Sequence, residues 1–138
     1  MLLLVPLLAH CASVNQSLLQ SFSSDQLHDN EHLIRTGHYR EAADELSMLL
    51  EMDENNEQAL FLRGVANQYL EQYSFAVRDY SRVTELNPKF ILAYYNLGMI
   101  EAFILNDRAL AKKAFEQFLA LAPNHPEAFG VSKILSSL

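Results

Sequence analysis

The sequence predicts an all-α fold built from repeated helix–turn–helix units, and three observations support this prediction. The chain has 138 residues, half of them hydrophobic, which suits one domain with enough apolar surface to form a core. It has only four glycines and four prolines, too few for the many turns of a small β-sandwich or β-barrel. Residues of the same type recur at intervals of 34 or 35 positions, which indicates an internal repeat.

The repeat is clearest in small residues, tyrosines and prolines. Gly64 and Gly98 are 34 residues apart, and Pro88 and Pro123 are 35 apart. Three further pairs follow the same spacing: Tyr39 with Tyr73, Ala42 with Ala76, and Ala76 with Ala111. A fixed spacing that involves several residue types indicates one structural unit used repeatedly.

Hydrophobic residues within each unit follow the period of an α-helix. In residues 75–86, apolar and aromatic side chains alternate with charged ones at helical spacing, as expected for a helix with one buried face. We expect the recurring small residues where two helices cross closely, because a larger side chain would force the helices apart. Pro88 and Pro123 are expected to close their units, since proline disfavours helical geometry in the residue before it.

These motifs resemble the tetratricopeptide repeat (TPR), a helix–turn–helix unit of 34 residues. The third unit matches it best, with Tyr94-x2-Leu97-Gly98, then Ala111-x3-Phe115, then Pro123. The resemblance implies three repeats and a C-terminal capping helix. The predicted ranges are 23–56, 57–90 and 91–124 for the repeats and 125–138 for the cap.

The resemblance also implies a binding site, because the first helices of TPR units line a concave groove that binds a peptide or a helix. Carried over by position, the groove residues are Phe61, Val65, Tyr69, Leu92, Tyr95, Met99 and Phe103. The alternative is that some of them are buried by the N-terminal segment or by the capping helix. Some TPR domains bind acidic C-terminal tails through a clamp of Lys, Asn and Arg; the corresponding positions here are Leu27, Glu31, Gln58, Leu92 and Asn96. Only Asn96 fits that clamp, so such tails are not the expected ligand.

Residues 1–22 carry no charged side chain and are predicted to be a targeting segment with a linker. The apolar run Met1–Ala9 is too short to span a bilayer. It leads into Leu8-Ala9-His10-Cys11-Ala12-Ser13, which resembles a bacterial lipobox, although His10 departs from that pattern. The resemblance implies lipidation of Cys11. Export without lipidation, or an apolar helix that packs on the domain with Cys11 buried, are the alternatives.

Charge and motifs argue against several other functions. The net charge is −7, and the stretch from Asp25 to Glu57 contains ten acidic and two basic residues, so a nucleic acid is not an expected partner. We find no glycine-rich phosphate loop and no nucleophile elbow, and we expect no cofactor, no resident metal and no small-molecule substrate. His28, Glu31 and His32 form an H-x-x-E-H pattern, which is typical of one class of zinc protease.

The sequence therefore favours a non-enzymatic scaffold that binds a protein or peptide partner. We expect it at a bacterial envelope membrane, where it would help to assemble envelope or secretion machinery, like small TPR lipoproteins. The alternative is a cytoplasmic chaperone of the type III secretion kind, which holds hydrophobic segments. A weaker alternative is a metal-dependent hydrolase that uses His28, Glu31 and His32.

Overall fold

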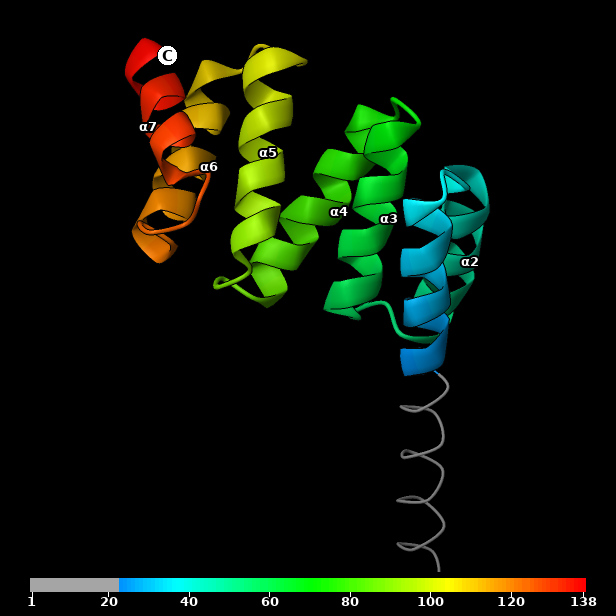
Figure 1. The fold of residues 1–138 in the computed structure, drawn as a ribbon. Helices are drawn as coiled ribbons and strands as arrows, with labels where there is room; N and C mark the ends of the chain where they lie inside the picture. The colour runs from blue at the N-terminus through cyan, green and yellow to red at the C-terminus, as the bar shows by residue number, and fades with distance from the viewer. Residues whose placement is uncertain (1–22) are drawn as a thin grey trace, which may run out of the picture.

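The computed structural model describes residues 23–138, which form a row of α-helices (Figure 1). The first helix is described over residues 23–35. Six helices follow it: α2 (Tyr39–Met52), α3 (Glu57–Tyr69), α4 (Tyr73–Leu86), α5 (Ile91–Phe103), α6 (Arg108–Leu121) and α7 (Ala128–Ser137). Residues 23–138 contain no β-strand, and the predicted all-α fold is confirmed.

Three tight turns reverse the chain, and each contains one residue with a positive φ angle. Gly37 has a φ of 85°, Glu71 of 59° and Asn106 of 55°. These positions are themselves 34 and 35 residues apart, so the same turn recurs in each pair of helices. Because α3 ends at Tyr69 and α4 begins at Tyr73, whereas α5 ends at Phe103 and α6 begins at Arg108, the last turn is one residue longer. This insertion explains the change in spacing from 34 to 35.

Polar side chains and prolines mark the helix ends. The Asn56 side chain accepts a hydrogen bond from the Ala59 backbone N–H at the start of α3, and Asp107 does the same for Leu110 at the start of α6, both at 3.0 Å. Such caps satisfy N–H groups that have no partner within the helix. The helix α7 begins at Ala128, three residues after the predicted start at 125, because the chain first makes a turn that the Ala128 N–H closes on the His125 carbonyl at 2.9 Å.

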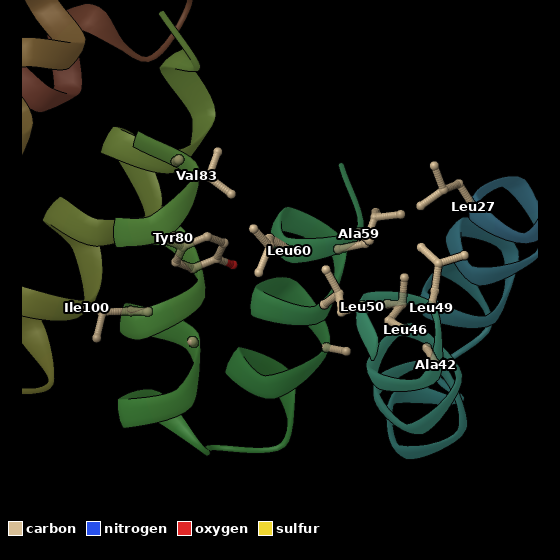
Figure 2. Close-up of a cluster of buried hydrophobic side chains, with 14 residues drawn as sticks. Leu27, Ala42, Leu46, Leu49, Leu50, Ala59, Leu60, Tyr80, Val83 and Ile100 are labelled. Carbon is tan, nitrogen blue, oxygen red and sulfur yellow. The ribbon is translucent and has the colours of Figure 1, made fainter. Parts of the chain in front are cut away.

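The core runs along the row of helices in two clusters. The larger cluster extends from Leu27 in the first helix to Ile100 in α5, and Figure 2 shows these side chains meeting between successive helices. The smaller cluster joins α6 to α7 through Ala111, Phe115, Phe118 and Val131. Each helix therefore buries its apolar face mainly against its neighbours in the chain, as in other repeat proteins.

The recurring small residues lie at close helix contacts, as predicted. A Cβ atom added to Gly64 in α3 would lie 2.7 Å from Cε1 of Tyr80 in α4, and Gly98 in α5 faces the ring of Phe115 in α6 in the same way. Ala76 and Ala111, the other small residues of the repeat, are completely buried. In the second and third units an aromatic ring of the second helix thus occupies the space that a side chain would need on the first.

Gly98→Ala is expected to lower the free energy of unfolding by about 1–3 kcal/mol, because the new methyl group would overlap the buried Phe115 ring. The matched control is Gly130→Ala in α7, where an added Cβ meets no atom within 4 Å. That change should raise stability by about 0.5–1 kcal/mol through helix propensity alone. Urea denaturation of both variants measures the difference. Equal stabilities would contradict the packing described above.

Candidate functional site

A hollow of about 370 Å³ lies against α3 and α5, at the ends of these helices that precede the tight turns. Its lining residues are Gln68, Tyr69, Tyr73, Met99, Ile100, Phe103 and Ile104. Three of the seven predicted groove residues, Tyr69, Met99 and Phe103, are therefore brought together. Tyr69 is 61% exposed and Phe103 is 59% exposed, which is unusual for large side chains that share one concave surface.

Tyr69 is held in place despite its exposure. Its ring stacks on the ring of Tyr39 in α2, with centroids 4.4 Å apart and planes 5° apart. The contact joins two successive repeats and leaves the other side of the Tyr69 ring free to meet a ligand. An aromatic ring fixed in this way loses little conformational freedom on binding, which favours affinity.

The other predicted groove residues contribute less free surface. Phe61 packs against Phe90 at a centroid distance of 4.9 Å, and it also contacts Tyr80. Tyr95 packs against Phe118 in α6 at 5.5 Å. Val65 is half-buried against the larger core cluster, whereas Leu92 is 42% exposed at the other end of α5. Phe61, Val65 and Tyr95 thus belong partly to the core and do not line the hollow.

Burial raises the pKa of two tyrosines near the site. Burial raises the pKa of Tyr80, and its hydroxyl group donates a hydrogen bond of 2.9 Å to Oε1 of Gln68 in the hollow. Burial also raises the pKa of Tyr95, and the negative charge of Glu127 adds to this effect. A tyrosine with its ordinary pKa of about 10 is already neutral at physiological pH, and these shifts move the pKa of both hydroxyl groups further away from it.

Sequence reasoning missed three hydrophobic residues of the hollow, Tyr73, Ile100 and Ile104. Ile100 lies in α5 at a position that was not assigned to the groove, and the other two lie outside the first helices that were considered. Tyr73 is the first residue of α4, and Ile104 follows the end of α5. Both line the hollow beside Phe103. The recurrence of tyrosine at positions 39 and 73 was the available signal, since both residues support the site.

The comparisons with known proteins agree with this architecture. The family model "Tetratricopeptide repeat" matches residues 91–125, the segment with the clearest motif. Solved TPR structures superimpose on most of the chain, including the first TPR domain of Spaghetti (RPAP3) bound to the HSP90 peptide SRMEEVD. Residues 91–125 match the tetratricopeptide repeat, and residues 23–138 have the helical array of TPR structures. The Spaghetti domain is 27% identical, with a TM-score of 0.75 over 83% of this chain and 94% of its own.

A second structural neighbour of this protein is SycD, a type III secretion translocator chaperone of Yersinia enterocolitica. SycD is 19% identical, with a TM-score of 0.76 over 83% of this chain and 81% of its own. SycD in complex with a peptide of the translocator YopD is also 19% identical, with a TM-score of 0.75 over 83% and 89% of the two chains. At this identity the likeness concerns the fold. No curated protein matches the sequence.

The remaining predicted sites of the protein lie elsewhere. Cys11 and the segment 1–22 lie outside the described residues. His28 and His32 are exposed on the first helix, and Glu31 accepts a hydrogen bond of 3.0 Å from Gln58. Within residues 23–138, three or more His, Cys, Asp or Glu side chains do not come together at any point in a way that could hold a metal ion. In the same part of the chain, every helix is too short or too polar to cross a membrane.

Proposed function

We propose that this protein is an interaction scaffold that binds an apolar peptide or the apolar face of a partner helix. The observation that carries the proposal is the exposure of Tyr69 and Phe103 in one hollow, where Met99 adds a flexible apolar side chain. Rigid aromatic rings beside an adaptable methionine are suited to apolar side chains at helical spacing. The proposed site also includes the other predicted groove residues of α3 and α5, which are Phe61, Val65, Leu92 and Tyr95.

Two structural neighbours support peptide binding, since SycD is seen with a YopD peptide and the Spaghetti domain with an HSP90 peptide. The proposed ligand here is apolar rather than an acidic tail. Glu31 stands at one of the clamp positions and would repel such a tail, while the other positions hold Leu27, Gln58, Leu92 and Asn96. Only Asn96 matches the clamp of Lys, Asn and Arg, so an acidic tail is not the proposed ligand.

Selection from a library of random displayed peptides, followed by cross-linking, tests this function. A photoreactive benzoylphenylalanine placed at position 103 should cross-link to the selected peptides. The same group at position 75, where Phe75 is 48% exposed on α4 outside the hollow, should not. Cross-linking from position 75 alone would place the binding face elsewhere. We expect the selected peptides to carry apolar residues at helical spacing.

The proposal extends to repeat boundaries and location. We take the units as 23–56, 57–90 and 91–124, a division supported by the helix bounds and the recurring turns. We place the protein at a bacterial envelope membrane through a lipid on Cys11, on the strength of the resemblance of residues 8–13 to a lipobox. The alternative, a cytoplasmic chaperone of the type III secretion kind, is favoured by the likeness to SycD.

Cys11→Ser is expected to move the protein from the membrane fraction to the soluble fraction of a bacterial host, because the acylated thiol would be lost. Intact mass of the wild type should show loss of residues 1–10 and an added acyl mass. Ser13→Ala, which leaves the cysteine in place, is the control and should stay with the membrane. A soluble wild-type chain that still begins at Met1 would support the cytoplasmic alternative.

A further inference from the structure

A second cleft lies on the opposite side of α5 from the hollow. Its volume is about 340 Å³, at the lower end of the range of about 300–1,000 Å³ for ligand pockets. Tyr94, Leu97 and Glu101 of α5 face this cleft, and with about 3.6 residues per turn they point away from Met99 and Phe103. The helices α4 and α6 supply the other walls, through Val77, Ser81, Thr84, Leu110, Lys113, Ala114 and Gln117.

Glu101 is the unusual residue of this cleft. It is only 5% exposed, and within residues 23–138 its carboxyl group makes no hydrogen bond or ion pair, but its oxygens are not fully enclosed and meet the cleft. Burial raises the pKa of Glu101, and the negative charge of Asp107 raises it further. The charged group on the facing wall of the cleft is Lys113 of α6, an exposed residue. A carboxylate that meets water only at the cleft is poorly solvated, so a cationic ligand that pairs with it there would offset part of the cost of its burial.

The preceding repeat shows what such a cleft can hold. The equivalent cleft there is lined by Ala43, Ser47, Arg63 and Asn67, each 34 residues before Val77, Ser81, Leu97 and Glu101. The guanidinium of Arg63 donates two hydrogen bonds of 2.8 Å to Asp79 and one of 3.2 Å to Ser47. An arginine of the protein itself thus enters this cleft and is paired there.

The third repeat has lost that arginine. Leu97 stands at the position of Arg63, and Ala114 stands at the position of Asp79, so the ion pair is replaced by two apolar side chains. Ser81 keeps the hydroxyl group of Ser47, and Glu101 replaces the neutral Asn67. The cleft therefore has a negative charge and a hydroxyl group where the preceding repeat has its guanidinium.

We propose that the cleft between α4, α5 and α6 binds an arginine side chain of a partner polypeptide. The guanidinium would pair with Glu101 and donate to Ser81, while its aliphatic stem would pack against Leu97 and Leu110. A planar guanidinium suits a carboxylate and a hydroxyl acceptor in a partly apolar site better than a compact ammonium. This site is independent of the hollow on the other side of α5, so a partner can contact both faces of the array.

The probe is the peptide N-acetyl-Leu-Arg-Leu-amide, titrated into ¹⁵N-labelled protein while amide chemical shifts are recorded. Saturable shifts are expected at Leu97, Glu101 and Ala114. Glu101→Gln should weaken binding at least tenfold, because it removes the charge that pairs with the guanidinium. The control variant is Glu116→Gln in α6, since Glu116 lies outside the cleft, where its carboxylate is 4.0 Å from the ammonium group of Lys112. This variant should bind the peptide like the wild type. Equal binding by Glu101→Gln would overturn the proposal.

Four further measurements keep the test decisive. The peptide with citrulline in place of arginine should not bind, since it has the same shape without the charge. Binding to the wild type should weaken as the pH falls through the pKa of Glu101, because protonation removes the carboxylate. The double variant Leu97→Arg, Ala114→Asp copies the internal pair of the preceding repeat and should fold and exclude the peptide. Butylguanidinium bound as tightly as the peptide would indicate a free cation and contradict a polypeptide partner.

Discussion

Asp79→Ala is expected to lower the free energy of unfolding by about 3–5 kcal/mol, the largest loss that we expect from a single polar substitution in this protein. The Asp79 side chain is 2% exposed and pairs with both nitrogens of one edge of the Arg63 guanidinium. Removal of the carboxylate would leave a charged group 18% exposed and without its partner. Because Arg63 retains some access to water and its contact with Ser47, we expect the lower end of the range.

The double variant Arg63→Leu, Asp79→Ala is the control, because the next repeat has these two residue types at the equivalent positions. Leu97 and Ala114 occupy these two positions in the next repeat, where α5 and α6 pack together without that ion pair. The double variant should therefore be close to the wild type in stability, since both charges are removed together. Urea denaturation of the four proteins gives the coupling free energy. Additive losses would show that the two side chains stabilise the fold independently.

Much of the fold could be predicted from the sequence because the residues that recur in the repeat are those that make contacts within one pair of helices. Gly64 and Tyr80, or Gly98 and Phe115, are close in sequence and meet within one helical pair, so their spacing alone indicates the contact. The turns repeat with equal regularity, and the longer third turn was visible as a change of spacing. Such contacts involve few residues and recur in successive units, so the sequence spacing is sufficient to predict them.

The candidate site was predictable only in part because its details depend on contacts between side chains of different helices. Tyr69 and Phe103 were found from their position in the unit, and both line the hollow. Phe61 and Tyr95 occupy equivalent positions, yet their rings pack on Phe90 and Phe118. Equivalent positions predict which way a side chain points, whereas the neighbouring residues determine how much of it stays free.

Glu101 shows a different limit of prediction from the sequence. In the sequence it is one acid in a hydrophobic helix, and nothing in its type distinguishes a solvated residue from a buried one. The structure places it on the side of α5 that α4 and α6 cover. Comparison of the two clefts position by position then shows that the pair of Arg63 and Asp79 has no counterpart beside Glu101.

Phe103→Ala is expected to weaken the binding of a selected apolar peptide by tenfold or more. An aromatic anchor in a binding groove commonly contributes ~2 kcal/mol, and about 1.4 kcal/mol corresponds to a factor of ten. Because Phe103 is 59% exposed, its truncation should leave the helical circular dichroism signal and the melting temperature unchanged. Fluorescence anisotropy of the labelled peptide measures the change in Kd.

The choice of control decides what this result means. Tyr95→Ala removes a ring that packs on Phe118, so lower affinity there could follow from lower stability. Phe75→Ala removes the same side chain as Phe103→Ala at similar exposure, outside the hollow and against Arg78. A peptide that binds in the hollow should respond to Phe103→Ala and ignore Phe75→Ala. If instead both variants bind the peptide like the wild type, the exposed rings of Tyr69 and Phe103 do not form the binding site.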